Sequence, residues 1–323
     1  MSFGKLAWFT TSRGQFYMKI AATGTAFGIF SIQYLPHTFL LNHYRDFVGL
    51  RRNGKPYPLT AELKNTFDKV LDDIKVPAFS RKFLEPFMVY GYDVWHAGSI
   101  YGYCGAKIGL PINYTYKKPG EIDKSGIIIN DEFVNWNRKE ARSLLEALIL
   151  PENAKKFAIA REIFMVDNHN AIIQPLISCF LFFTYYILTS SINERMQLFD
   201  KPRQLRYFIY GALGLFMWGI WAMQKDVMTR YYEYDADERA SKLGIEYTKG
   251  GLEFYSKVIQ RNIALRELGG SNGAKTYTKG GNDTITFREK HIPNTSRKQF
   301  FEQALKDHET GNVSDTEAEL AIA

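Results

Sequence analysis

The chain contains very little cysteine, since Cys104 and Cys179 are the only two in 323 residues. Two cysteines supply neither a disulfide framework nor a cysteine-ligated metal site. Hydrophobic residues make up 46% of the chain and aromatic residues 15%, a composition that excludes disordered and collagen-like proteins. The chain therefore has enough apolar material for one or two packed cores.

Acidic residues are absent from the first 45 positions, and the first acid is Asp46. Lys5, Arg13 and Lys19 stand there among several serines and threonines, a composition typical of a mitochondrial import signal. We therefore predict a basic targeting or flanking segment at residues 1–19 and a mitochondrial location. The cytosolic flank of a first membrane span would have the same composition.

The formal net charge of +7 does not point to nucleic acid. Basic residues are scattered among the acids rather than gathered with aromatics, and no nucleic-acid-binding motif occurs. We expect no nucleic-acid partner. Residues 307–323 carry five acids and neither lysine nor arginine, so this tail is predicted to be disordered.

Three runs lack charged residues, namely 20–41, 169–193 and 207–224. Each is close to the roughly 17 to 25 residues that a helix needs to cross a bilayer. The sequence therefore predicts three transmembrane helices, with residues 194–206 as the short loop of a hairpin between the second and third. The first run also contains Thr23, Gln33 and Pro36, so a buried or amphipathic segment is its alternative.

A membrane hairpin returns the chain to the side it left, so residues 42–168 and 225–306 can form one globular domain that is split in sequence. A stretch rich in Val, Ile, Tyr and Gly from Phe87 to Tyr116, with GIIIN following at Gly126, predicts a small sheet with hairpins. Helical patterns cover residues 60–76, 138–150, 152–168, 225–243, 252–268 and 296–306, and a loop is expected at 271–283. Thr60 is expected to cap the first of these helices. The predicted fold class is a membrane protein, mainly α with a small β-sheet.

The predicted order of sheet, helix, membrane hairpin and helix resembles the membrane zinc peptidases of the HtpX and prenyl-protein endopeptidase type. In these enzymes a helix bearing H-E-x-x-H precedes the hairpin, and a later helix supplies E-x-x-x-D. Glu233 and Asp237 match the second motif, and the late segment HIPNTSRKQF is similar to the one that closes the peptidase fold. The resemblance implies a metallopeptidase-like globular domain, with a zinc-ligand position at Glu233 and a hydrogen-bonding role for Asp237.

The first motif lacks both of its histidines. Arg161-Glu162-Ile163-Phe164-Met165 stands at the matching place, so a guanidinium and a thioether occupy the two ligand positions. Arginine is always protonated and repels a dication, and methionine is a poor zinc ligand. We therefore predict a pseudo-peptidase without metal, cofactor or catalytic residue, whose degenerate site consists of Arg161, Glu162, Met165, Glu233 and Asp237.

The charge of an arginine at this position has to be stabilised, either by solvent or by an acidic side chain. Because an unpaired buried charge costs several kcal/mol, we hypothesise that Arg161 pairs with Glu233, and also with Glu162, where zinc would have joined the two helices. The alternative is a solvated Arg161 on the helix surface.

Several short segments spread along the chain carry a second resemblance, namely Lys156–Ala158 with Ala160–Glu162, Gly250-Gly251, Glu253–Tyr255, Asn262 with Ala264–Arg266, and Lys290-His291 with Pro293. Together with the three predicted spans they resemble the transmembrane protein 177 family. The resemblance implies a multi-pass protein of the mitochondrial inner membrane that has no enzymatic activity and assists early assembly of cytochrome c oxidase. It implies newly made oxidase subunit II and the small membrane chaperone that receives it as partners.

The residues by themselves support a narrower function. A membrane-anchored domain with the peptidase shape but without metal ligands is expected to hold a polypeptide as a strand beside a sheet edge, which the Phe87–Tyr116 region would supply. An active membrane zinc peptidase with an altered site and a structural membrane scaffold are the alternatives. Basic residues before the first span and in the hairpin loop favour a globular domain in the intermembrane space, although Arg45 and Arg51 lie on the opposite side.

Overall fold

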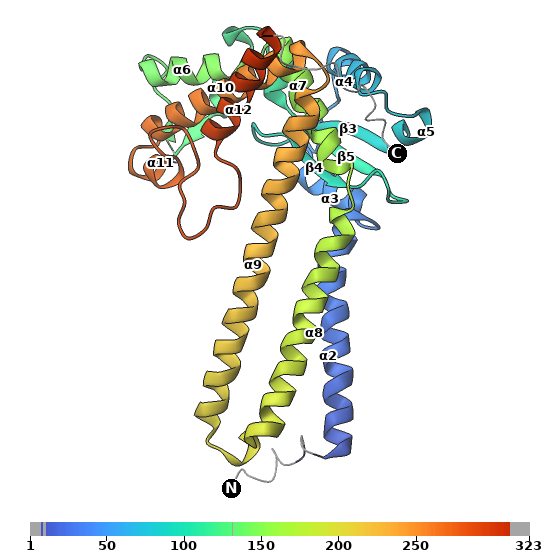
Figure 1. Cartoon of the computed structure of the whole chain (residues 1–323). Coiled ribbons are helices and arrows are strands. Elements are labelled where there is room, and N and C mark those ends of the chain that lie inside the picture. Colours follow the sequence, from blue (N-terminus) through green and yellow to red (C-terminus); the bar gives the residue numbers. More distant parts are fainter. Residues whose placement is uncertain (1–7, 9–10, 131, 311–323) are drawn as a thin grey trace. The chain divides into compact units, whose positions relative to one another are not determined.

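A computed structural model describes residues 8, 11–130 and 132–310, and these form two compact units, mostly helical with small sheets (Figure 1). One unit comprises Met1–Leu40 and His169–Met228, and the other comprises Leu41–Asn168 and Thr229–Ala323. In the predicted basic segment, residues 1–7, 9 and 10 lie outside the described residues. In the predicted acidic tail, residues 311–323 lie outside them.

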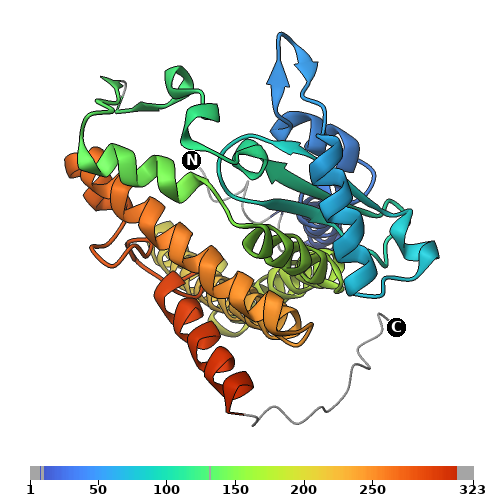
Figure 2. The same ribbon diagram turned by 90° about the horizontal axis from the view of Figure 1, so that it is seen from above.

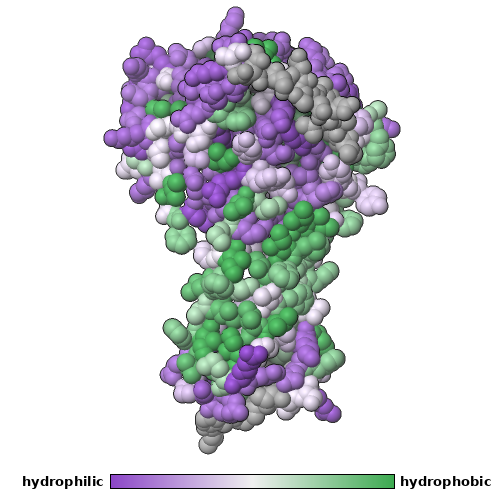
Figure 3. Space-filling model, in the orientation of Figure 1, coloured by the Kyte–Doolittle hydropathy of each residue, from purple (hydrophilic) through white to green (hydrophobic). Residues whose placement is uncertain are grey.

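The first unit consists of α2 (Ser12–Tyr34), α8 (Asn170–Met196) and the first part of α9 (Arg203–Ser241), with η6 (Leu198–Asp200) between the last two. α2 packs against α8, where the Cys179 thiol donates to the Ala26 carbonyl at 3.3 Å. The Trp221 indole of α9 donates to the Ser178 hydroxyl of α8 at 3.0 Å. Large apolar side chains cover the outside of these helices (Figure 3), so the unit presents a hydrophobic surface.

Within the described part of the chain, α8 is the one helix that is long and apolar enough to cross a membrane. Its 27 residues span about 40 Å at the usual helical rise, more than the hydrocarbon thickness of a bilayer. The other two predicted spans contain Thr, Gln, Tyr, Trp and Gly, which lower the mean hydropathy of their helices.

The bounds of two predicted spans need correction. α2 begins at Ser12, because Thr11 caps it by accepting the Gly14 N–H at 3.1 Å, and it ends at Tyr34 rather than at 41. Pro36 lies in the 3₁₀ turn η2 (Leu35–His37) that follows. The helices expected at 207–224 and 225–243 form the single helix α9, since neither a proline nor a capping glycine separates them.

The second unit contains a three-stranded sheet of β3 (Leu84–Val89), β4 (Trp95–Gly98) and β5 (Ala106–Pro111) in the order β3-β5-β4. β5 is buried along its whole length, pairs parallel to β3 and pairs antiparallel to β4, so β4 is an edge strand. The predicted small sheet is confirmed, with β4 and β5 as its hairpin. The prediction is wrong in that β3 and β5 are parallel and the GIIIN segment lies in a separate pair. That pair joins β6 (Ile128–Ile129) to β7 (Glu132–Phe133), and a further small hairpin joins β1 (Arg51–Arg52) to β2 (Lys55–Pro56).

The helices of the second unit are α3 (Leu41–Val48), α4 (Ala61–Asp73), α5 (Ala78–Arg81), α6 (Lys139–Leu148), α7 (Glu152–Val166), the second part of α9, α10 (Ile245–Leu268), α11 (Gly270–Thr276) and α12 (Asn294–Glu309), with 3₁₀ turns η3 (Ile112–Thr115), η4 (Pro119–Glu121) and η5 (Lys124–Gly126). Thr60 caps α4 by accepting the Leu63 N–H at 3.3 Å, as the pattern predicted. The loop expected at 271–283 is in part helical, because α11 occupies its beginning.

α7 lies at the centre of this unit's core. α10 packs against α6, α7 and α12 (Figure 2), and the rings of Phe157, Tyr255 and Phe301 meet where these helices converge. A Cβ at Gly250 would stand 2.2 Å from the Asn153 carbonyl oxygen of α7, and one at Gly251 would stand 2.5 Å from the Phe301 ring of α12. The two adjacent glycines therefore let α10 approach α7 and α12 closely, and this packing places the polar residues of α7 opposite those of α9.

Candidate functional site

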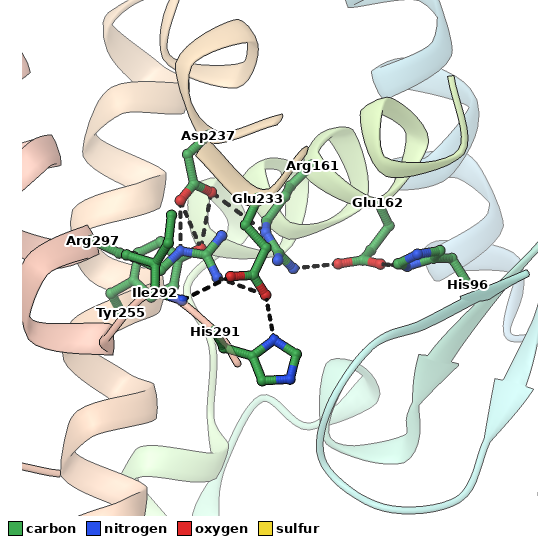
Figure 4. Close-up of polar contacts among 9 residues, drawn as sticks. All are labelled: His96, Arg161, Glu162, Glu233, Asp237, Tyr255, His291, Ile292 and Arg297. Carbon is green, nitrogen blue, oxygen red and sulfur yellow. Dashed lines mark hydrogen bonds and ion pairs between the residues drawn. The ribbon is translucent and has the colours of Figure 1, made fainter. Parts of the chain in front are cut away.

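Both carboxylate oxygens of Glu162 on α7 are occupied. Its side chain is buried, with Arg161 Nη1 2.5 Å from Oε1 and the His96 Nδ1 2.6 Å from Oε2. His96 comes from the edge strand β4, so Glu162 connects the helix to the sheet (Figure 4). The carboxylate therefore has a partner on each side.

Asp237 on α9 collects three partners from three other helices. The Tyr255 hydroxyl of α10 donates to it at 2.9 Å, and Arg297 Nε of α12 donates at 2.6 Å. Arg161 Nε of α7 stands 3.4 Å from its Oδ1. Asp237 is buried, so this carboxylate is an interior junction of α7, α9, α10 and α12.

Glu233 lies one helical turn before Asp237 and is held by the segment that leads into α12. The His291 Nδ1 lies 2.8 Å from its Oε1, and the Ile292 backbone N–H donates to its Oε2 at 2.9 Å. Arg297 Nη1 is 3.9 Å from Oε1. The segment predicted to close a peptidase fold thus lies directly on the glutamate that would have been a zinc ligand (Figure 4).

Of the two partners predicted for Arg161, Glu162 is confirmed and Glu233 is wrong. Arg161 pairs with Glu162 and Asp237, so it does connect α7 to α9, but through the aspartate. The position beside Glu233 is taken by Arg297, whose arrival from α12 could not be read from local spacing. Met165 is half-buried and packs on the apolar core, whereas the other four residues of the predicted site lie together.

Charge explains the cohesion of this cluster. Two guanidiniums face three carboxylates, and the rings of His96 and His291 bond to two of those carboxylates. Burial alone would raise the pKa of Glu233, but His291, Arg297 and Arg161 outweigh it and hold the pKa at about 2. The bond to Glu233 raises the pKa of His291 above its usual value. Both shifts favour the charged forms that pair with each other.

The pKa values of Arg161 and Glu162 are also shifted toward the charged forms. Burial by itself would lower the pKa of Arg161, yet the surrounding Tyr255, Glu162 and Asp237 keep it above its usual range. Burial would raise the pKa of Glu162, and Arg161 and His96 lower it. The guanidinium of Arg297 stacks over the Tyr255 ring at 4.6 Å, which joins the charged cluster to the aromatic core.

These residues do not fit a zinc ion. No group of three or more histidine, cysteine, aspartate or glutamate side chains among the described residues is arranged to hold a metal. Arg161 fills the place of a ligand, and its charge is already engaged by two carboxylates. Glu162, at the position that a general base would occupy, has one oxygen bonded to a guanidinium and the other to an imidazole.

Sequence reasoning missed four side chains of the cluster, namely His96, Tyr255, His291 and Arg297. Arg297 and His291 lie in the HIPNTSRKQF segment, so its similarity to the closing segment of the peptidases was a usable signal. Tyr255 was part of a segment quoted for the family resemblance without a role. His96 carried no signal, since a single histidine in a strand pattern does not reveal which helix will pack beside it.

Comparisons with known proteins agree with the family resemblance. A family model described as transmembrane protein 177 matches residues 89–289. The chain is 30% identical to transmembrane protein 177 of Rattus norvegicus over 277 residues, which cover 85% of this chain and 88% of the relative. It is 28% identical to the Homo sapiens protein of that name, with 90% and 93% of the two chains covered, and 27% identical to that of Xenopus laevis, with 92% and 97% covered.

No solved structure matches the chain. The family model includes α7, both site residues of α9 and all of α10, so the match covers most of the residues that build the cluster. The relatives are covered almost from end to end, which excludes a match confined to one motif. The chain belongs to the transmembrane protein 177 family.

Proposed function

We propose that this protein is a mitochondrial inner-membrane assembly factor without enzymatic activity, and that it holds newly made cytochrome c oxidase subunit II together with its membrane chaperone. The observation that carries the proposal is the state of the degenerate site. Arg161 stands where a peptidase has its first zinc histidine and is locked between Glu162 and Asp237. A domain of this kind retains a means of binding a polypeptide while lacking the means to cut it.

The edge strand β4 is the proposed binding element. It pairs with β5 on one side only, and an extended segment can add to such an edge through backbone hydrogen bonds. The Trp95 ring of β4 stands edge-on to the rings of Tyr44 and Phe87, with centroid distances of 5.0 and 5.6 Å. These rings supply apolar contacts for alternate side chains of a bound extended segment. His96 of the same strand is tied to Glu162, so the ion cluster holds the strand in place.

The membrane arrangement proposed with this function has three spans, formed by α2, α8 and the first part of α9. Lys201, Arg203 and Arg206 lie at the turn between α8 and α9, and the positive-inside rule places that turn in the matrix. The globular unit then faces the intermembrane space. Protease treatment of mitoplasts should digest a C-terminal tag. Protection of the tag would instead place the globular unit in the matrix.

The binding proposal is tested by site-specific crosslinking in mitochondria that are synthesising their own proteins. A photoreactive amino acid at Trp95 of β4 should crosslink to newly made subunit II, and the same group at Lys298, on the outside of α12, should not. Equal yields at both positions, or no subunit II at either, would contradict the proposal. A Glu162→Gln variant should reduce the Trp95 crosslink; full retention would favour a structural scaffold.

A further inference from the structure

A small pocket, open to solvent, lies at the beginning of two helices in the globular unit. The first turns of α4 contribute Thr60, Glu62 and Thr66, η3 contributes Thr115, and the first turn of α7 contributes Glu152 and Lys155. It therefore lies at the opposite end of α7 from the ion cluster. Apart from Thr60, which was expected only as a helix cap, none of the residues named here was singled out from the sequence.

Lys155 is the unusual member of this pocket. Its side chain is more than nine-tenths buried, at 7% exposure, yet within the described residues no hydrogen bond or ion pair engages its ammonium group. Lysine is almost never buried to this degree unless it is paired. The neighbouring Lys156 is the ordinary case, because its ammonium stands 3.6 Å from Glu246.

The Lys155 nitrogen must face the pocket. Several side-chain polar atoms of the described residues are both fully enclosed and without a partner, and Nζ of Lys155 is not one of them. Since Nζ also has no partner, it keeps contact with open space, and the pocket is the space that Lys155 lines. A buried stem therefore carries a reachable amine.

The surroundings of Lys155 favour the neutral amine more than water does around an exposed lysine. Burial lowers the pKa of Lys155, and this outweighs Glu152, Glu62 and Glu121, which raise it, while Lys117 lowers it further. A neutral amine has a free lone pair and is a nucleophile, which is why desolvated lysines form covalent bonds in enzymes.

Further groups in the pocket suit a reaction at a carbonyl carbon. Glu152 precedes Lys155 by one helical turn on the same face, and its Oε1 accepts the Thr66 hydroxyl at 3.0 Å, which leaves Oε2 to take up a proton. The Thr60 hydroxyl lines the same space and can donate to a carbonyl oxygen, whereas the Thr115 hydroxyl already donates to the Ile112 carbonyl at 2.7 Å. At the rim, Lys117 pairs with Glu62 at 2.7 Å and leaves Lys155 unpaired.

We propose that Lys155 is a site of covalent acylation by short acyl thioesters. The neutral Nζ attacks the thioester carbonyl, the new N–C bond forms, and the C–S bond breaks. The proton lost from nitrogen passes by way of Glu152 to the departing thiolate, so that an amide and a thiol are the products. No oxidant or reductant takes part, and the inference does not rest on the proposed function.

The test uses the full-length protein in detergent with a small acetyl thioester, N-acetylcysteamine thioacetate, and measures acetylation of each lysine by peptide mass spectrometry. Lys155 should be acetylated at least tenfold faster than Lys156 near neutral pH, although it is the more buried of the two. In denaturant the two rates should become equal, because the difference comes from the fold. A rate at Lys155 equal to or below that at Lys156 in the folded protein would overturn the proposal.

Two comparisons refine the test. A Glu152→Gln variant should slow acetylation of Lys155 and leave that of Lys156 unchanged, whereas an unchanged Lys155 rate would remove Glu152 from the step as proposed. A hexadecanoyl thioester should not modify Lys155, because the pocket admits only a short chain. Equal modification by the long thioester would overturn the selectivity for short acyl groups.

Discussion

The two ends of α7 bury a cation in opposite ways. At one end Arg161 lies between two carboxylates in a closed cluster, and at the other Lys155 lines an open pocket without an ion-pair partner in the described chain. The paired guanidinium of Arg161 joins α7 to α9. Its removal would leave two buried carboxylates without this partner. Burial without pairing produces no such connection and leaves an amine available for chemistry.

The largest expected effect is a loss of stability when the paired cation, Arg161, is removed. Arg161→Ala leaves Glu162 and Asp237 buried with fewer partners, so the free energy of unfolding should fall by about 3 to 5 kcal/mol. The matched control, Lys156→Ala on the same helix, removes a single long ion pair and should cost less than about 1 kcal/mol. Chemical denaturation in detergent measures both, and equal losses would contradict a structural role for the cluster.

Acid should loosen the same cluster in a defined range of pH. The pKa of Glu233 is about 2 in the folded chain against 4.5 ordinarily, so its stabilisation is present above pH 4.5 and is lost as the pH falls toward 2. The loss should reach about 3 kcal/mol. Glu233→Gln should flatten this part of the stability profile, whereas Glu238→Gln, which removes an exposed pair with Lys242, should leave it unchanged.

At the unpaired end, replacement of the cation should have the opposite sign. Lys155→Met keeps the apolar stem and removes a buried charge without an ion-pair partner, so stability near neutral pH should rise by about 1 kcal/mol. Thermal unfolding of the two proteins side by side measures this. A loss of stability as large as that of Arg161→Ala would show that both ends of α7 use their cations alike.

The smallest expected effect concerns His291, whose side chain is mostly exposed. Its pKa is raised by Glu233, so its contribution is present below its unfolded value of 6.5 and disappears as the pH rises through the higher folded value. His291→Gln should remove about 0.5 kcal/mol of pH dependence in this range. His308→Gln on α12 serves as the control, and an identical profile for both variants would contradict the link to Glu233.

Local patterns predicted local structure well. The Thr60 cap and the helical spacing of Glu233 and Asp237 were readable, because each depends on neighbours in the chain. The presence of Arg161 and Met165 where an H-E-x-x-H motif would have its histidines was readable for the same reason. The confirmed family resemblance was likewise carried by short contiguous segments.

Features set by long-range packing were not readable. The partner of Arg161 is Asp237 rather than Glu233 because Arg297 arrives from α12, some 60 residues away from both acids in sequence. β3 pairs in parallel with β5 because the chain passes through β4 between them, and hydrophobic alternation does not encode strand order. Lys155 escaped notice because burial without a partner is a property of the surroundings, and the residues around it in sequence are those of an ordinary helix.

The most direct measurement is the zinc content of the purified full-length protein, determined beside a buffer blank. We expect no zinc above the blank, because Arg161 pairs with Glu162 and Asp237 at the place where a ligand would stand. One zinc per chain in the natural protein would contradict the assignment of Arg161 to an ion cluster and return the protein to the metallopeptidases.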